Sequence, residues 1–480
     1  MSLDITHNPY RRTKIVCTIG PSTSSASMIK ELLQVGMDIA RINFSHGTHK
    51  EHASYIRTLQ QAAKQAGVPL AIMQDLPGHK NRTGKLKKGA IELTENTDFV
   101  LTTKEVLGDE HRVSVGLPDL PKNVKSGDMI FIDDGAIELK VVATSKTEVS
   151  CQVVTGGKLG EDKGINIPGI TWDAPTTTEE DWNHLLFGLK HNVDFIALSF
   201  IREANDVIKV RNFLQKRKKT PALIAKIERR EALDNLDEIL EATDGAMVAR
   251  GDLGIEIPIQ RVPIVQKEII QKCNRLGKPV IVATQMLESM VNAPRPTRAE
   301  VTDVANAIFD GADALMLSEE TAVGSYPVEA VSMMSQIALE AETALPYEEI
   351  LTNKGKDLQP QTDDAISYAA CHAAHQLGAA AIIAFTSSGS TARRVSKYRP
   401  RVPILAITPS QVTQRQLSLS WGVRAFQIPE PSKIAVLFAR GARVAKRTGL
   451  AQDGDLVVIT GGVPIGISGS TNLLKVEKVK

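Results

Sequence analysis

Charged side chains follow two short apolar runs in the middle of the sequence, at residues 223–228 and 247–254. In the first run Lys226 and Glu228 are two residues apart, and they point the same way because a strand alternates its faces with period two. In the second run the glycines beside Asp252 break the strand into a tight loop, which suits a backbone that approaches a ligand. A lysine and two carboxylates at neighbouring strand ends would form a divalent metal site beside an electrophilic cation. A solvated ion-pair cluster is the alternative, because such networks mimic active sites.

Short apolar strands that alternate with amphipathic helices must position these side chains. We expect strands at residues 13–19, 37–43, 68–75, 194–199, 222–227, 245–249, 279–284 and 312–317. Eight strand–helix units predict an α/β fold, a (β/α)8 TIM barrel over residues 1–76 and 173–345. A doubly wound sheet is the structural rival.

Polar residues at the carboxyl ends of the strands decide between these two folds. A barrel brings all the strand ends to one mouth, whereas an open sheet would scatter them. The residues concerned are Arg41, Asn43, Asp75, Lys226, Glu228, Asp252, Thr284, Ser318 and Glu320.

Two further regions differ from the barrel pattern. Residues 77–172 have little helical periodicity, and the turn at 133–135 between apolar runs is a strong hairpin signal, so we expect an inserted β-barrel lid domain there. Residues 346–480 contain an amphipathic helix at 361–377 and strands at 379–385, 402–408 and 455–460. They predict a separate C-terminal α/β domain.

The composition is that of an ordinary globular protein. Of 480 residues 42% are hydrophobic and 23% charged, and the net charge of +2 gives no indication of a nucleic-acid partner. The four cysteines are widely spaced, which is typical of free thiols in a reducing compartment. No apolar run is long enough for a membrane span, and the N-terminus lacks a signal-peptide core. We therefore expect a cytoplasmic protein without membrane partners.

Seven stretches, taken in order, resemble the pyruvate kinase family. They lie at residues 12–21, 41–47, 225–228, 247–254, 283–290, 296–306 and 316–322. The resemblance extends from about Arg12 to Val479. It implies a barrel, an inserted lid, a C-terminal effector domain and a homotetramer. The implied reaction is transfer of the phosphoryl group of phosphoenolpyruvate to ADP, giving pyruvate and ATP.

Phosphoryl transfer needs positioned cations around the moving group. Arg41 and Arg82 can supply guanidinium forks. By resemblance, Lys226 steadies the phosphoryl group and the enolate oxygen, and Glu228 and Asp252 hold Mg²⁺ or Mn²⁺. The backbone N–H groups of Gly251 and Asp252 can hold the substrate carboxylate. Thr284 lies where the family's threonine helps to protonate the enolate; the sequence leaves a water open as the acid.

Several more residues are expected near the nucleotide or a monovalent cation. Lys163 resembles the lid lysine that reaches the nucleotide phosphates, and Asn43, His46 and Arg82 are further nucleotide candidates. The candidates for the monovalent-cation or supporting positions are Asn43, Ser45, Asp75 and Ser318. Simpler roles stay open: Arg82 capping a strand end, Ser318 and Glu320 as structural hydrogen-bonding residues, and His46 in packing.

One segment departs from the family pattern. Where many members have Asp-Thr-Lys-Gly-Pro-Glu-Ile-Arg, this chain has Asp-Leu-Pro-Gly-His-Lys-Asn-Arg at residues 75–82. Leu76 and Lys80 mark members that do not need K⁺, because the ammonium of Lys80 can take the place of K⁺ and the two cations would repel. We therefore expect K⁺-independent activity. Pro77, His79 and Asn81 are less usual at this hinge and bear on lid closure.

Regulation is read from the C-terminal domain. The turn at 386–391 follows a strand and precedes a helix, so its hydroxyl and N–H groups can converge on an anion, although it also fits a plain helix start. By resemblance the effector phosphate lies at Thr386, Ser387, Ser388, Ser390 and Thr391. The facing loop, residues 460–472, has no arginine. This favours a sugar monophosphate or AMP over a bisphosphate.

Two rival functions share parts of this pattern. A metal-dependent aldolase or decarboxylase on a barrel would use Lys226, Glu228 and Asp252 without needing the lid or Lys163. A non-enzymatic sugar-phosphate sensor with a decayed barrel would have lost these charged residues first. ADP-dependent formation of pyruvate separates the alternatives.

Overall fold

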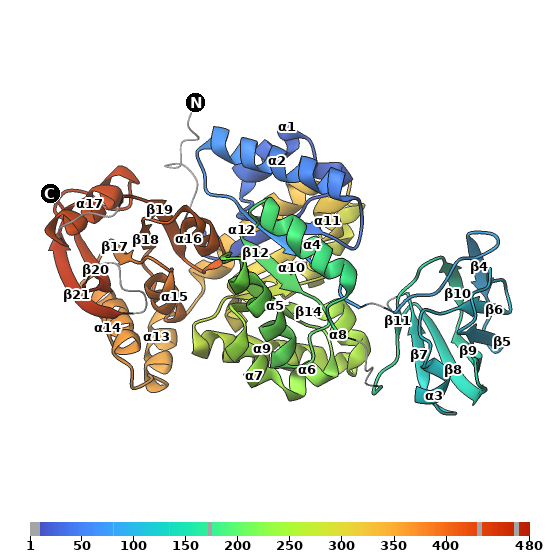
Figure 1. The fold of residues 1–480 in the computed structure, drawn as a ribbon. Coiled ribbons are helices and arrows are strands. Elements are labelled where there is room, and N and C mark those ends of the chain that lie inside the picture. Colours follow the sequence, from blue (N-terminus) through green and yellow to red (C-terminus); the bar gives the residue numbers. More distant parts are fainter. Residues whose placement is uncertain (1–9, 80, 134, 171–174, 430–433, 465–469) are drawn as a thin grey trace.

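A closed barrel of parallel strands forms the centre of the molecule (Figure 1). The computed structural model describes residues 10–79, 81–133, 135–170, 175–429, 434–464 and 470–480. The barrel strands are β1 (Lys14–Thr18), β2 (Ile39–Asn43), β3 (Ala71–Asp75), β12 (Phe195–Leu198), β13 (Ala222–Ile227), β14 (Gly245–Ala249), β15 (Val280–Ala283) and β16 (Ala314–Leu317). They close in the order β1-β16-β15-β14-β13-β12-β3-β2, which confirms the predicted barrel and excludes the doubly wound sheet.

Helices surround this barrel. They are α1 (Ala26–Val35), α2 (His49–Ala66), α4 (Glu179–Lys190), α5 (Ala204–Lys216), α6 (Arg230–Asp234), α7 (Leu236–Ala242), α9 (Val262–Leu276), α10 (Arg298–Asp310) and α12 (Pro327–Thr343). Thr48, Thr178 and Thr297 cap α2, α4 and α10, each with a reciprocal acidic residue three positions on. The long apolar faces of these helices bury one side of every barrel strand.

Alternation along the strands separates the two faces of the barrel. Val16, Ile39, Met73, Ala197 and Ile224 pack together inside it, while their neighbours in sequence pack against the helices. Two residues further along these five strands the inward position becomes polar. These positions hold Thr18, Arg41, Asp75, Ser199 and Lys226. The strand period therefore turns an apolar interior into a polar mouth at the carboxyl ends.

The inserted segment folds on its own core. One sheet has the order β11-β7-β8-β9-β5-β6, and a second pairs β10 with β4. The elements are β4 (Ala90–Leu93), β5 (Asp98–Thr102), β6 (Arg112–Ser114), α3 (Leu120–Asn123), β7 (Met129–Ile132), β8 (Ile137–Thr144), β9 (Glu148–Thr155), β10 (Gly157–Gly160) and β11 (Ile165–Asn166). β7 and β8 form the hairpin that the turn at 133–135 predicts. Figure 1 shows this domain standing to one side of the barrel.

The C-terminal region is a second α/β unit. Its sheet has the order β19-β18-β17-β20-β21, with only β21 antiparallel to its neighbour. The elements are α13 (Tyr347–Lys356), α14 (Thr362–Gln376), β17 (Ala381–Phe385), α15 (Ser390–Lys397), β18 (Ile404–Thr408), α16 (Gln411–Gln416), β19 (Val423–Gln427), α17 (Ile434–Arg447), β20 (Leu456–Gly462) and β21 (Thr471–Lys478).

Buried polar contacts join this unit to the barrel at the end opposite the mouth. Arg399 donates to Asp313, which precedes β16, at 3.0 Å, and Arg415 donates to Asp194, which precedes β12, at 2.8 Å. Lys14 at the start of β1 donates to the carbonyl of Val423 at 2.8 Å. No helix among the described residues is both long and apolar enough to cross a membrane.

Candidate active site

Four buried side chains of alternating charge fill the mouth of the barrel. Arg41 Nε donates to Asp75 Oδ2 at 2.6 Å, and Lys226 Nζ lies 3.3 Å from Asp75 Oδ1. Lys226 Nζ also lies 2.8 Å from Glu228 Oε1. Asp75 and Glu228 are each only 1% exposed. Two cations and two carboxylates are thus fixed in one row with little water between them.

The ionisation of this row follows from its burial and its charges. Burial opposes ionisation of Asp75, but its two cations outweigh that effect and hold its pKa below the usual value. Burial likewise disfavours the charged form of Lys226, yet the two carboxylates raise its pKa. Burial, aided by repulsion from Asp252, raises the pKa of Glu228 in spite of Lys226. Glu228 is therefore the one carboxylate of the row whose charge is under-compensated.

That deficit fits a bound cation. Glu228 Oε2 already accepts the backbone N–H of Phe200 at 2.7 Å, and the nearby charge of Asp252 acts on the same carboxylate. No cluster of three or more candidate ligand side chains occurs in the part of the chain that the structure describes. A pair of carboxylates suits a hard divalent ion that takes its other ligands from substrate oxygens and water.

Thr284 lies on a strained turn directly after β15. Its φ is +70° and that of Gln285 is +54°, a left-handed conformation that costs a β-branched residue about 1–3 kcal/mol. Its hydroxyl donates to the carbonyl of Ala283 at 2.6 Å and accepts the N–H of Gly251 at 2.9 Å. Gly251 is the second residue of helix α8 (Arg250–Glu256), which follows β14 directly, so the threonine links the ends of β14 and β15.

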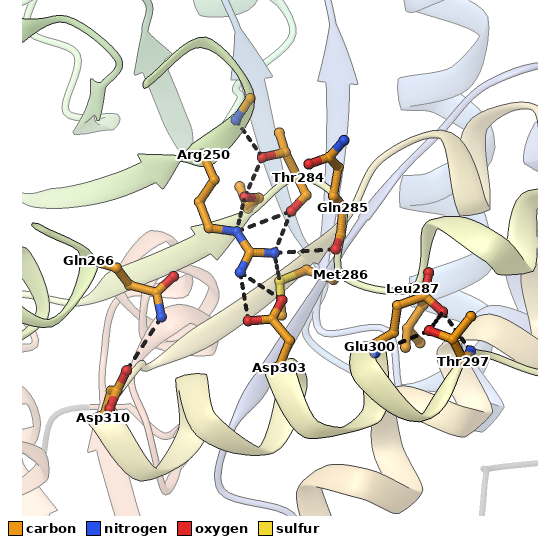
Figure 2. A network of polar contacts seen from close by, with 12 residues as sticks. Arg250, Gln266, Thr284, Gln285, Met286, Leu287, Thr297, Glu300, Asp303 and Asp310 are labelled. Atoms are coloured by element: carbon orange, nitrogen blue, oxygen red, sulfur yellow. Dashed lines mark hydrogen bonds and ion pairs between the residues drawn. The ribbon is translucent and has the colours of Figure 1, made fainter. Parts of the chain in front are cut away.

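The side chain of Arg250 packs against this turn, as Figure 2 shows. Its guanidinium donates to the carbonyls of Ala283, Thr284 and Gln285, the shortest contact being 2.6 Å to Thr284. On its other side Nη1 donates to both carboxylate oxygens of Asp303, at 2.9 and 2.7 Å.

Sequence reasoning missed Asp303 and two hydroxyls of the mouth. Ser199 accepts a hydrogen bond from Lys226 at 2.7 Å and donates to the carbonyl of Leu76, and Thr18 accepts one from Arg41 at 2.9 Å. Ser199 and Thr18 stand at inward positions of their strands, so the period-two pattern would have found them. Asp303 lies on a helix far along the chain and carries no such signal.

The carboxylate of Glu320 is bound by backbone N–H groups. It accepts the N–H of Ser318 at 2.6 Å and that of Leu287 at 3.1 Å, and it is 2% exposed. These contacts brace the loop that follows β15 and the helix α11 (Glu319–Ala322), which is the structural role that the sequence left open for Ser318 and Glu320.

The predicted nucleotide residues divide between barrel and inserted domain. Arg82 donates to the carbonyl of Asp162 at 2.8 Å, and Lys163 pairs with Asp133 at 2.9 Å, so both cations are bound within the inserted domain and not to the row in the mouth. Asn43 accepts the N–H of Ser45 at 3.1 Å, and Ser45 and His46 are exposed on the loop after β2. Lys80 lies outside the described residues.

The predicted effector turn is largely occupied by its own hydrogen bonds. Thr386 accepts the N–H of Gly389 at 2.8 Å, and the hydroxyl of buried Thr391 lies 2.7 Å from that of Thr471. Ser388 donates to Ser390, and Ser387 offers its carbonyl to Thr413. Beside the turn, between the barrel and the C-terminal unit, lies a pocket of about 700 Å³. Its polar lining consists of the basic residues Arg211, Lys278, Arg393 and Arg394, the hydroxyl residues Thr243 and Ser390, and the acidic residues Glu238, Glu241 and Asp244.

Comparison with known proteins covers nearly the whole chain. Residues 10–331 match the family described as pyruvate kinase, barrel domain, and residues 364–477 match pyruvate kinase, alpha/beta domain. A pyruvate kinase of Geobacillus stearothermophilus is 49% identical over 472 residues, which are 98% of this chain and 80% of the relative. One from Staphylococcus aureus is 46% identical over 471 residues, with the same coverage. The crystal structure of a pyruvate kinase from Cryptosporidium parvum superposes with a TM-score of 0.92 at 38% identity, covering 99% of this chain and 97% of that one.

Proposed function

The chain belongs to the pyruvate kinase family, and from this premise we propose which of its residues carry out the reaction. The enzyme transfers the phosphoryl group of phosphoenolpyruvate to ADP, giving pyruvate and ATP, the last step of glycolysis. The bond between phosphorus and the enol oxygen breaks, a terminal oxygen of ADP forms the new P–O bond, and C3 of the enolate takes up a proton. The buried row Arg41–Asp75–Lys226–Glu228 is the observation that carries our assignment.

Lys226 and Arg41 stabilise the moving phosphoryl group. Charge is spread over its oxygens during transfer, so fixed cations at the mouth lower the barrier most when they need no reorganisation. Asp75 provides that order, because it binds both cations from inside the barrel. Lys226 also faces the enolate oxygen as the P–O bond breaks.

Members of this family use a divalent metal, and we assign its protein ligands to Glu228 and Asp252. The raised pKa of Glu228 in a buried setting supports this assignment, because a cation there would relieve its uncompensated charge. Mg²⁺, or Mn²⁺ in its place, would neutralise charge on the substrate oxygens when bound. The N–H groups at the start of α8 and the hydroxyl of Thr284 then face the substrate carboxylate and C3. Thr284 passes a proton to C3 and regains one from solvent.

The nucleotide is bound from both sides of the mouth. Lys163 and Arg82 of the inserted domain reach its phosphates, and Asn43 and His46 lie on the barrel side. Both lid cations must first leave their partners in the inserted domain. In the sequence Lys80 replaces the glutamate of many members, and its charge takes over from the K⁺ for which Asn43, Ser45 and Asp75 are the candidate side chains, so that the enzyme needs no K⁺.

The C-terminal domain regulates the enzyme by binding a sugar monophosphate or AMP. The turn at 386–391 and the cations of the adjacent pocket support a single-phosphate ligand there. We further propose a homotetramer in the cytoplasm. If Arg393→Met abolishes the shift that glucose 6-phosphate or AMP produces in the phosphoenolpyruvate saturation curve, the effector assignment stands; an unaltered shift refutes it.

The metal assignment is tested by titrating Mg²⁺ at saturating phosphoenolpyruvate and ADP. Glu228→Gln keeps the shape of the side chain and removes its charge, so the Mg²⁺ concentration for half-maximal rate should rise at least ~10-fold. Glu320→Gln is a matched control, because Glu320 is equally buried but binds only backbone N–H groups. An unchanged Mg²⁺ requirement in Glu228→Gln would refute the assignment.

A further inference from the structure

The Thr284–Gln285 turn needs an external restraint. Two consecutive non-glycine residues have positive φ, and one of them is a β-branched threonine. Such a conformation persists only where the surroundings fix it. The threonine hydroxyl contributes two hydrogen bonds of its own, to Ala283 and from Gly251, but these leave the carbonyl of Thr284 to be oriented by something else.

Arg250 supplies that restraint through the backbone carbonyls. It binds those of Ala283, Thr284 and Gln285 with one side of its guanidinium. The orientation of the guanidinium depends in turn on Asp303, because both of its carboxylate oxygens accept hydrogen bonds from Nη1 of Arg250. In Figure 2 the guanidinium lies between the turn and Asp303 of helix α10. Arg250 is 13% exposed, whereas Asp303 is 36% exposed on the outer side.

We propose that Asp303 is a positioning residue for proton delivery to the enolate. Through Arg250 it keeps the turn after β15 in the left-handed conformation that holds the hydroxyl of Thr284 beside the N–H of Gly251, where the ends of β14 and β15 meet. This inference rests on the proposed role of Thr284. Asp303 touches no reacting atom, so its loss disturbs the position of the proton donor and leaves the phosphoryl-binding row intact.

Asp303→Asn tests the proposal with the least change of shape. We expect kcat to fall roughly 10- to 100-fold, because a displacement of about 1 Å at a catalytic group costs on that order. KM for phosphoenolpyruvate should stay within about threefold, since Arg41 and Lys226 are untouched. A uniform loss of substrate affinity with unchanged kcat would overturn the proposal.

Proton transfer is measured directly in the reverse direction. Removal of a proton from C3 of pyruvate must precede re-addition, so exchange of the C3 hydrogens for deuterium in D₂O, with Mg²⁺ and ATP, reports this step by NMR. Asp303→Asn should slow the exchange by the same factor as kcat. Asp310→Asn on the same helix is the matched control, because Asp310 contacts Lys267 and Gln266 away from the turn (Figure 2). The Asp310→Asn enzyme should catalyse the exchange at the wild-type rate.

A double-mutant cycle with Thr284→Val separates this inference from the proposed function. If both single variants slow exchange and the double variant is no slower than Thr284→Val, Asp303 acts through the threonine. If Thr284→Val slows exchange and Asp303→Asn does not, the positioning role is refuted while the proton donor stands. If Thr284→Val exchanges normally, the assignment of the donor falls, and the positioning role with it.

A loss of fold is excluded by thermal unfolding of each variant. Asp303→Glu gives a second check, since it keeps the charge and should recover part of the exchange rate that Asp303→Asn loses. If Asp303→Glu is as slow as Asp303→Asn, the negative charge is not what orients Arg250, and the proposal fails.

Discussion

The barrel mouth and the inserted domain both present cations, but they hold them differently. In the mouth Lys226 is 12% exposed and lies between two carboxylates that are themselves buried. In the inserted domain Lys163 is 38% exposed and pairs with a single carboxylate, Asp133, of similar exposure. The mouth is therefore fixed before substrate arrives, whereas the lid cations have partners that they can exchange.

This difference sets the size of the effects that each region can have. A charge pair in a buried site interacts several times more strongly than one near water, so the row in the mouth acts on the transition state with little screening. Exposed pairs contribute at most ~1 kcal/mol and are screened by salt. Substitutions in the mouth should therefore reduce the rate itself, and substitutions in the lid should mainly weaken nucleotide binding.

The largest effect is expected at Lys226. Lys226→Met keeps the length of the side chain and removes the charge that we propose faces the phosphoryl group and the enolate oxygen. We expect kcat to fall by at least ~10³-fold, at the upper end of what loss of one stabilising donor costs. The measurement is single-turnover formation of pyruvate, with thermal unfolding to show that the barrel remains folded.

Lys226→Met can also destabilise the fold, since it leaves the buried carboxylates of Asp75 and Glu228 with one cation fewer. The double variant Lys226→Met/Glu228→Gln removes one charge of each sign and serves as the control for stability. A kcat within tenfold of wild type in a folded Lys226→Met protein would refute the central role of the mouth.

A smaller effect is expected in the lid. Lys163→Met should raise KM for ADP about tenfold, equal to about 1.4 kcal/mol of binding, and change kcat by less than about threefold. Lys88→Met is a matched control, because Lys88 pairs with Glu110 on the same domain and is 72% exposed. If the two variants have the same KM for ADP, Lys163 does not contact the nucleotide. If kcat of Lys163→Met falls 100-fold, the contrast between mouth and lid is wrong.

Sequence patterns predicted the mouth well because its geometry is local. Residues 39, 41 and 43, or 224, 226 and 228, share a face by strand period alone, and a closed barrel then brings those faces together. The barrel strands, the hairpin of β7 and β8 and the helix α14 follow from the same alternation and turn chemistry. Some bounds shifted inward: the third strand begins at Ala71, three residues after the predicted start.

Sequence patterns did not predict which charged side chains pair with each other. Arg250 and Asp303 are 53 residues apart, and nothing in either helix indicates that they meet. The pairing of Lys163 with Asp133 likewise depends on how β11 lies against β7. The strands β19 and β21 were not predicted, and half of the residues of β21 are exposed at the edge of the described sheet. Long-range pairing is a tertiary property, which local periodicity does not encode.

A buried histidine makes the stability of the barrel depend on pH. His52 on α2 is 4% exposed and packs on Phe44 and near His49 and His184. Burial, aided by repulsion from these histidines, lowers its pKa from 6.5 to about 4. The unfolded chain therefore binds a proton more readily than the folded barrel does, so stability is fully present above pH 6.5 and is lost as the pH falls toward 4.

His52→Gln should remove this dependence. We expect wild-type stability to fall by up to about 3 kcal/mol more than that of the variant between pH 7.5 and 4.5, measured by urea unfolding. His111→Gln is the control, because His111 is exposed in the inserted domain. If His52→Gln and wild type lose stability equally, another group, with His184 the first candidate, governs the acid response of the barrel.

The smallest effect is expected where the two regions join. The carboxylate of Asp75 is already bound by Arg41 and Lys226, and the sequence that follows it contains Lys80, whose charge we propose replaces K⁺. Exchange of K⁺ for tetramethylammonium at constant ionic strength should change kcat by less than about twofold, because a second cation beside the ammonium would be repelled.

A variant with the reverse substitutions tests the role of Lys80. Leu76→Thr/Lys80→Glu removes the ammonium and restores two oxygen-bearing side chains, so its activity should rise many-fold on addition of K⁺, with tetramethylammonium as the control cation. If the wild type responds to K⁺ as strongly as this variant, Lys80 does not supply the missing charge. The fixed row in the mouth would then depend on a diffusible ion, and the contrast between a preformed barrel site and an exchangeable lid would no longer hold.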